Sequence, residues 1–260
     1  MKKIFAIALS VMLLALCFAV SAGAAEYVYY ENDFSDAATL SDFTVMKGEW
    51  DCVDGQLMLV GFGECDMDDQ GWLLFSKDEG IMNLTDYILE VDMMNIQTQA
   101  GPLVRCDIDN CFPENNSGFC GYQTFISFTG TKGAIGYGKL DGNWGGNLLV
   151  SEDVTAPAAN IHLKSTVQGT TITYVMTDLD TGAELWTGVV ENDLYAYGTF
   201  GFRSCIMKDG ITNLGMLGYD NLKITAIGSV GDHLAAGKAL KDYVPTVKGT
   251  AIKPEITNPV

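Results

Sequence analysis

Five charged residues occur in three short segments in which charged and apolar residues alternate. Their carboxylate and guanidinium groups accept and donate hydrogen bonds, which suits a hydroxyl-rich ligand such as a glycan. In an extended strand, residues two apart point to the same face, so each segment is predicted to have one charged face. If the three strands pair, a single polar sheet surface is formed by Glu90, Asp92, Arg105, Asp107 and Arg203. The alternative is a solvated face with cross-strand ion pairs of about 0.2–1 kcal/mol each.

The opposite faces of these segments are mainly apolar. The residues expected there are Leu89, Val91 and Met93 in YILEVDMM, Val104, Cys106 and Ile108 in PLVRCDI, and Phe200 and Phe202 in TFGFRSC. A sugar also needs an apolar platform, and Trp144 in DGNWGGN is a candidate because glycines leave few neighbours to bury it. The alternative is that its ring folds back over the end of the domain.

These residues need a sheet to hold them, and the rest of the chain has the pattern of one. Between residues 26 and 228, roughly a dozen strand-like segments alternate with turn residues. The pairs Asp54-Gly55 and Gln168-Gly169 each lie between two such segments, which predicts two hairpins. No amphipathic helix precedes residue 230. The sequence therefore predicts an all-β fold, an antiparallel sandwich or barrel.

The two ends of the chain differ from this central domain. Residues 1–25 have the order of a cleaved signal peptide, with Lys2 and Lys3 before an apolar run and small residues before Glu26. The alternative, a membrane anchor, is disfavoured because the run is shorter than the ~20 apolar residues of a spanning helix. Residues 229–260 lack a core-forming pattern and are predicted to be a weakly structured tail or linker. We therefore expect a secreted or cell-surface protein with one domain over residues 26–228.

The composition is strongly acidic. The full chain has 15 basic and 33 acidic residues, a net charge of −18. Without the two signal lysines, 13 bases face 33 acids and the net charge is −20. Such a charge argues against nucleic acid and anionic membranes as partners, because their phosphates would repel it. Acidic loops also suit Ca²⁺.

Cysteine usage fits an exported chain. Six of the seven cysteines remain after the signal peptide: Cys52, Cys65, Cys106, Cys111, Cys120 and Cys205. An even number permits disulfides in several pairings. Cys111 and Cys120 flank the loop FPENNSGF and are the first candidate pair, whereas Cys106 could be a buried free thiol. The spacing does not match a zinc site, and His162 is expected at the surface.

Seven motifs occur in an order typical of one known family. They are YENDFSD, GEWDCVDGQL, DYILEVDM, AGPLVRCD, GYQTFIS, GFRS and GYDNLKI, and they extend over about residues 27 to 227. The chain resembles concanavalin A-like lectin/glucanase domains, most closely the laminin G-like and 3-keto-disaccharide hydrolase-type versions of secreted bacterial proteins. This resemblance implies a jelly-roll sandwich of two antiparallel sheets whose concave face often binds carbohydrate. Arg105 matches the arginine that ends the family's AG-x-x-x-R strand on that face.

The same resemblance implies a structural Ca²⁺ near the joined terminal strands. Asp33, just before Phe34, and Asp220, just after Tyr219, match those two strand ends. Ca²⁺ takes about 6–8 oxygen ligands, so backbone carbonyls would have to complete the site. The alternative is that each aspartate caps a turn through its own backbone.

One strand resembles the active strand of laminarinase-type glucanases, which carries a glutamate, an aspartate and a second glutamate on one face. Glu90 and Asp92 match the first two positions. Met94, or Asn95 if the strand bulges, stands where the second glutamate would be, and neither side chain can transfer the proton that glycoside hydrolysis needs. The sequence therefore favours a protein that is not an enzyme.

Together these features predict a secreted, non-catalytic, lectin-like carbohydrate-binding domain whose partner is a polysaccharide or other glycan. Two alternatives stay open at this point. One is a glycoside hydrolase of the same fold, and the other is a structural or adhesive surface protein with a protein partner.

Overall fold

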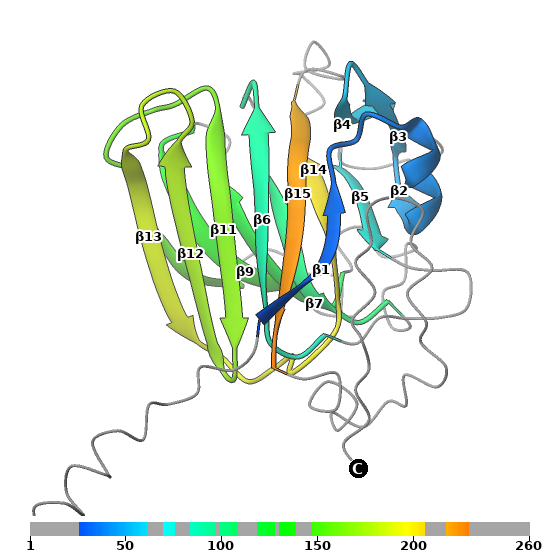
Figure 1. Ribbon diagram of the computed structural model, residues 1–260. Helices are drawn as coiled ribbons and strands as arrows, with labels where there is room; N and C mark the ends of the chain where they lie inside the picture. Colours follow the sequence, from blue (N-terminus) through cyan, green and yellow to red (C-terminus); the bar gives the residue numbers. More distant parts are fainter. Residues whose placement is uncertain are drawn as a thin grey trace, which may run out of the picture.

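The computed structural model describes residues 26–61, 70–75, 84–96, 99–108, 119–127, 130–138, 147–205 and 217–228. These residues form two antiparallel sheets packed face to face, and the predicted all-β jelly-roll sandwich is confirmed. In Figure 1 the eight-stranded sheet lies in front and the seven-stranded sheet behind it. The predicted signal peptide and tail lie outside the described residues. Within them, no helix is long and apolar enough to cross a membrane.

The eight-stranded sheet contains both ends of the described chain. Its strands follow the order β13-β12-β11-β6-β15-β4-β3, and β1 also pairs with β15. Their bounds are β13 Glu184–Glu191, β12 Thr171–Asp178, β11 Ile161–Gln168, β6 Tyr87–Met94, β15 Gly218–Ile227, β4 Gln56–Gly61, β3 Glu49–Val53 and β1 Glu26–Asn32.

The seven-stranded sheet has the order β10-β9-β8-β7-β14-β5-β2. Its strands are β10 Leu148–Asp153, β9 Lys132–Gly138, β8 Gly121–Ile126, β7 Gln99–Cys106, β14 Thr199–Cys205, β5 Gln70–Phe75 and β2 Phe43–Lys47. A short 3-10 helix, η1 Ala37–Asp42, begins after Asp36, whose carboxylate accepts a hydrogen bond from the Ala38 N–H. It leads from β1 in one sheet to β2 in the other.

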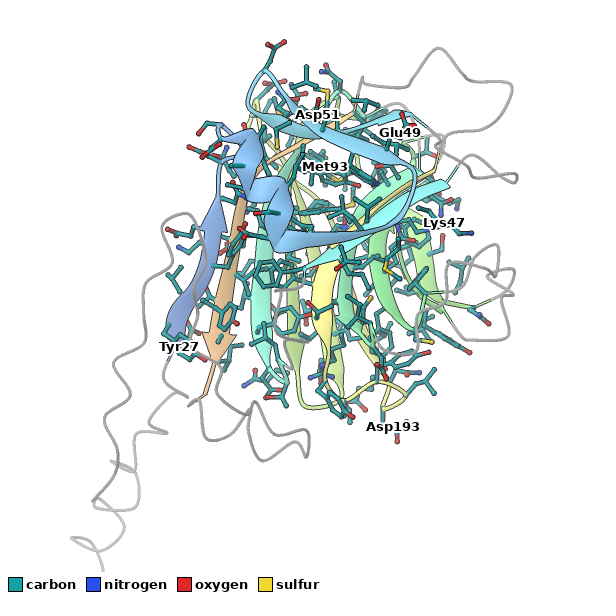
Figure 2. All side chains as sticks on the ribbon, turned by 90° about the vertical axis from the view of Figure 1, so that its right-hand side faces the viewer. Tyr27, Lys47, Glu49, Asp51, Met93 and Asp193 are labelled. Carbon is teal, nitrogen blue, oxygen red and sulfur yellow. The ribbon has the colours of Figure 1, made fainter. Side chains whose placement is uncertain are left out.

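The core lies between the two sheets and is rich in aromatic rings. Phe75 and Phe200 stack with centroids 4.7 Å apart, and Phe202 packs against Tyr219 at 4.5 Å. Such ring pairs contribute about 0.5–1.5 kcal/mol beyond the area they bury. Figure 2 shows side chains filling the space between the sheets. This packing explains why the aromatic segments near both ends of the domain belong to one core.

The alternation predicted for β6 is confirmed. Leu89, Val91 and Met93 are fully buried, whereas Glu90 and Asp92 on the opposite face are half-buried. The predicted turn at Asp54-Gly55 is also confirmed, since both residues have positive φ (51° and 77°) between β3 and β4. That conformation matches the type of two-residue turn preferred in hairpins.

The alternation predicted after Val104 is wrong. Arg105 has φ 51°, and the register between β7 and β14 shifts there, which is the signature of a β-bulge. A bulge adds one residue to one strand and reverses the faces beyond it. Cys106 therefore lies in the same apolar cluster as Leu103 instead of opposite it.

A polar atom in the core provides a stability prediction. The Tyr174 side chain is fully buried, and its hydroxyl has no hydrogen-bond partner in the described part of the chain. Since a buried hydroxyl without a partner costs about 1–3 kcal/mol, Tyr174→Phe is expected to raise the free energy of unfolding by about 1 kcal/mol. Urea denaturation measures this. Tyr122→Phe is the matched control and should lower stability, because the Tyr122 hydroxyl donates to Asn192 Oδ1 at 2.8 Å.

Candidate functional site

The two sheets separate the charged residues that the sequence places on one surface. Glu90 and Asp92 belong to β6, which lies between β11 and β15 in the eight-stranded sheet. Arg105 and Arg203 belong to β7 and β14, which are neighbours in the seven-stranded sheet, and Asp107 directly follows β7. The predicted shared surface is therefore wrong. Counting in twos identifies the two faces of a strand but not the sheet to which the strand belongs.

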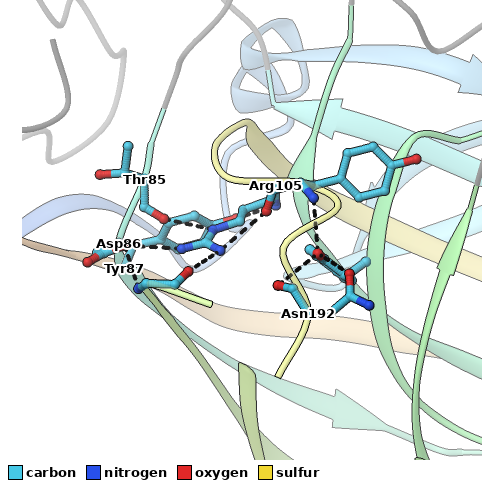
Figure 3. A network of polar contacts seen from close by, with 8 residues as sticks. Thr85, Asp86, Tyr87, Arg105 and Asn192 are labelled. Atoms are coloured by element: carbon cyan, nitrogen blue, oxygen red, sulfur yellow. Dashed lines mark hydrogen bonds and ion pairs between the residues drawn. The ribbon is translucent and has the colours of Figure 1, made fainter. Parts of the chain in front are cut away.

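Arg105 lies inside the structure, with only 1% of its side chain exposed. Its guanidinium group bonds to three separate segments of the chain (Figure 3). The distances are 2.9 Å from Nε to Thr85 O, 2.7 Å from Nη1 to Gly169 O, 3.3 Å from Nη1 to Tyr195 O, and 3.1 Å from Nη2 to Asp86 Oδ1. We call these five residues the Arg105 hub.

Further hydrogen bonds reinforce the hub. Asp86 Oδ1 also accepts from the Gly169 N–H at 3.0 Å, and the Arg105 N–H donates to the Tyr87 hydroxyl at 2.8 Å. The hub thus joins the start of β6, the β11–β12 turn and the segment after β13. Because its guanidinium hydrogens already point to protein acceptors, the geometry favours a structural role for Arg105.

Arg203 is also buried, at 1% exposure, on the face of β14 that points away from the core. Its Nη1 donates to Gln123 Oε1 at 2.9 Å, and its guanidinium carbon lies 5.8 Å from the centre of the Phe119 ring. Leu74 and Leu103 on the same face of the sheet are fully buried as well. This face is therefore not an open polar surface around Arg203.

The remaining residues predicted for the polar surface, and the cysteines near them, have different outcomes. Asp107 is half-buried, and its N–H donates to Cys120 O at 2.9 Å. Trp144 and Cys111 lie outside the described residues, so the aromatic platform and the Cys111–Cys120 bridge stay predictions. Cys106 is a fully buried free thiol, one of the two states the sequence allowed. Burial raises the pKa of Cys106 well above its ordinary value.

Glu90 and Asp92, by contrast, lie together in an accessible polar cluster. Opposite them on β11 is His162, whose Nδ1 is 2.7 Å from Asp92 Oδ1 and whose Nε2 is 3.8 Å from Glu90 Oε1. Asn221 Nδ2 donates to Asp92 Oδ2 at 2.9 Å, and Lys164 Nζ is 3.6 Å from Glu90 Oε1. We call these five residues the β6 cluster. Three neighbouring strands, β11, β6 and β15, hold it on the outer face of the eight-stranded sheet.

The side chains of the β6 cluster are open to solvent to different degrees. The exposed fractions are 15% for Asp92, 25% for Glu90, 36% for His162 and 42% for Lys164. Beside the cluster, the pairing of β11 with β6 and of β6 with β15 lines up Thr166, Ile88 and Thr225 across the sheet. The cluster is thus a set of ionic groups next to a row of β-branched side chains.

The contacts within the β6 cluster shift two pKa values in opposite directions. The hydrogen bond to Asp92 raises the pKa of His162 above 6.5, and the charges of Asp92 and Glu90 add to this, while burial and Lys164 oppose it. Burial is the largest influence on Asp92 and raises its pKa. The hydrogen bonds from His162 and Asn221 and the charge of His162 together outweigh burial, so the pKa of Asp92 falls below 3.8.

These shifts predict how stability depends on pH. A histidine whose pKa is raised by folding stabilises the protein fully below its unfolded pKa, and this contribution is lost as pH rises through the folded pKa. The melting temperature should therefore fall more in the wild type than in His162→Gln when pH is raised from about 6 to about 9. Thermal unfolding followed by circular dichroism measures both curves. Parallel curves would contradict the ion pairing of His162.

Sequence reasoning did not include three members of the β6 cluster: His162, Lys164 and Asn221. His162 was expected at the surface, and it does lie on the outer face with 36% of its side chain exposed, but its contact with Asp92 was not predicted. The signal that could have found it is the pairing of β11 with β6, in which His162 is opposite Asp92 and Lys164 is opposite Glu90. Asn221 has φ 50° and lies at a register shift in β15, so alternation does not predict its direction.

The two predicted metal ligands do come close to each other, as the joined chain ends require. β1 pairs with β15, and the charges of Asp92 and Asp33 add to burial in raising the pKa of Asp220. Each aspartate is nevertheless used locally. Asp33 Oδ1 accepts from Ser35 N and Oγ, and Asp220 Oδ1 accepts from the Asn221 N–H.

These local bonds match the turn-capping alternative. Among the residues that the structure describes, no group of three or more His, Cys, Asp or Glu side chains could hold a metal ion. Both aspartates thus cap turns in the described structure, and the Ca²⁺ site, which backbone carbonyls were expected to complete, stays a prediction.

Comparison with known proteins supports the fold through similar solved structures. No protein-family model matches the sequence. No curated protein matches it either. A Bacillus subtilis protein of unknown function with a galectin-like fold is similar in structure, with a TM-score of 0.54, 11% identity, and coverage of 78% of this chain and 97% of that one. A legume lectin-like domain from Entamoeba histolytica gives a TM-score of 0.51, 8% identity and the same coverage, 78% and 97%. The chain thus has a lectin-like jelly-roll fold.

Proposed function

We propose that this protein is an exported, non-catalytic carbohydrate-binding domain that binds a glycan at the β6 cluster. The observation that carries the proposal is the accessible arrangement of Glu90, Asp92 and His162 on the outer face of the eight-stranded sheet. The lectin-like fold and the predicted signal peptide support it. Closer kinship with laminin G-like or 3-keto-disaccharide hydrolase-type domains is part of the proposal and rests on the sequence motifs alone.

The chemistry of the β6 cluster suits hydroxyl groups. A hydroxyl both donates and accepts, and the cluster offers carboxylate acceptors beside the ammonium donor of Lys164 and the imidazole of His162. Hydrogen bonds to ionised groups are about twice as strong as those between neutral groups. The neighbouring half-buried side chains of Thr166 and Ile88 can contact the C–H face of a sugar ring. Since β-strands position all these groups, little ordering is needed on binding.

The same geometry argues against hydrolysis. A retaining glycosidase needs one carboxyl group as nucleophile and another as acid/base, about 5–5.5 Å apart. Asp92 has both oxygens engaged, one by His162 and the other by Asn221. The next outward position of β6 is Met94, which cannot transfer a proton. The proposal does not depend on Ca²⁺.

Retention on immobilised or gel-embedded polysaccharides tests the proposal. The panel should include β-glucans, galactomannan, xylan and pectin. Asp92→Ala and Glu90→Gln are each expected to weaken binding about tenfold or more, because each removes a hydrogen bond to a charged group. The matched control is Asp153→Ala, which removes a carboxylate that is 79% exposed on the other sheet and should leave binding unchanged.

Several outcomes would contradict the proposal. Absence of retention on every polysaccharide would contradict carbohydrate binding, and a coprecipitated protein that sugars fail to displace would favour the adhesive alternative. Release of reducing sugar that Glu90→Gln abolishes would contradict the non-catalytic assignment. Retention that Asp92→Ala leaves intact would place the site elsewhere on the domain.

A further inference from the structure

The position of His162 between two carboxylates of the β6 cluster suggests a control of this site. The imidazole ring has one nitrogen 2.7 Å from Asp92 Oδ1 and the other 3.8 Å from Glu90 Oε1. On the far side of β11, the residue opposite His162 in β12 is Thr177, which does not titrate. β11 itself adds Lys164, and β15 adds Asp220, Asn221 and Lys223 near the two carboxylates.

The two carboxylates differ in how firmly they are held. Asp92 accepts from His162 through one oxygen and from Asn221 through the other. Glu90 has only looser contacts, with nitrogen–oxygen distances of 3.8 Å to His162 and 3.6 Å to Lys164. A change in the charge of His162 should therefore move the Glu90 carboxylate more than the Asp92 carboxylate.

The two protonation states of His162 act differently on Glu90. In the cationic ring both nitrogens carry a proton, so Nε2 attracts the Glu90 carboxylate. In the neutral ring the proton stays on Nδ1, because Asp92 remains ionised and accepts it. Nε2 is then an acceptor that faces another acceptor, and its attraction for Glu90 is lost.

We propose that His162 is a proton switch: when charged it holds the Glu90 carboxylate together with Lys164, and when neutral it leaves Glu90 to Lys164 alone, so that the carboxylate can bind a sugar hydroxyl. The part that concerns sugar rests on the function proposed above. Affinity for a glycan is then higher above the pKa of His162 than below it. The contact with Asp92 raises the pKa of His162, so this change occurs above pH 6.5.

The switch can be tested without any glycan by NMR of the full mature chain. The side-chain carboxyl carbon of Glu90 should show an inflection at the pH where the His162 ring titrates. In His162→Gln the inflection should vanish. In Asp92→Asn, which removes the charge that raises the histidine pKa, the ring and Glu90 should shift together to lower pH. A Glu90 carboxyl shift that stays constant while the His162 ring titrates would overturn the inference.

Affinity electrophoresis separates this inference from the proposed function. In gels cast with laminarin or galactomannan, the wild type should bind about tenfold more tightly above the His162 pKa than below it, the size of one hydrogen bond to a charged group. His162→Gln should bind with little dependence on pH. Retention that is identical at both pH values in the wild type would overturn the switch and leave carbohydrate binding standing.

Discussion

Arg105→Ala is expected to lower the free energy of unfolding by about 3–5 kcal/mol, the usual cost of breaking a buried ion pair from one side. The guanidinium group is 1% exposed and bonds to Asp86 and to the carbonyls of Thr85, Gly169 and Tyr195. Without it, these acceptors stay buried with fewer partners. Asp86 is 30% exposed and can recover some water, which keeps the cost within this range. Urea denaturation of the purified variant measures it.

Two further variants make this prediction specific. Arg105→Lys keeps the charge but cannot reach three segments at once, because lysine lacks the planar fork of donors, so it should also destabilise strongly. Lys132→Ala is the control, since it breaks an exposed ion pair with Asp153 and should cost less than about 1 kcal/mol. A small loss of stability in Arg105→Ala, similar to that in Lys132→Ala, would show that the Arg105 hub does not hold its three chain segments together.

Trp186→Ala is the second substitution with a large expected effect, about 3–5 kcal/mol of stability. Trp186 is on β13, the edge strand of the eight-stranded sheet, and is 6% exposed. Its Nε1 lies 3.2 Å from Glu152 Oε2 on β10, the edge strand of the other sheet. A Cβ atom at Gly133 or Gly188 would come within 2.1 or 2.2 Å of the ring, so both glycines make room for it.

This side chain therefore closes one side of the sandwich between two edge strands. Thermal and urea unfolding of Trp186→Ala should show the loss, and Gly133→Ala should show a similar loss because the added methyl group displaces the ring. Val189→Ala is the control on the same strand, since Val189 is 58% exposed and should change stability by less than about 0.5 kcal/mol. Equal stability of Trp186→Ala and Val189→Ala would contradict this account of the edge.

The sequence predicts the fold class and the faces of some strands correctly for a physical reason. A half-buried strand such as β6 alternates between core and solvent, so Leu89 and Val91 inside and Glu90 and Asp92 outside can be identified by counting. The pairing of β1 with β15 was also expected, from the resemblance of the two end motifs to a jelly roll. Both features depend on local pattern or on motif order.

Other features depend on contacts between distant residues, which a pattern does not contain. Every residue of β7 and β8 is buried, so the charged Arg105 suggests a solvent face where none exists. The bulge at Arg105 turns Cys106 to the face opposite to the one that alternation predicts. Because the bulged residue is an arginine and not a glycine, the sequence does not indicate the bulge. His162 could be assigned to the cluster only once β11 was known to pair with β6.

The central claim is that a glycan binds the outer face of the eight-stranded sheet at the β6 cluster. The most direct test is an NMR titration of the isotope-labelled mature chain with oligosaccharides prepared from whichever polysaccharide retains it. The account predicts amide shift changes at Glu90, Asp92, His162 and Asn221, which Asp92→Ala abolishes. Changes centred instead on Gln123 and Arg203 in the seven-stranded sheet would contradict it.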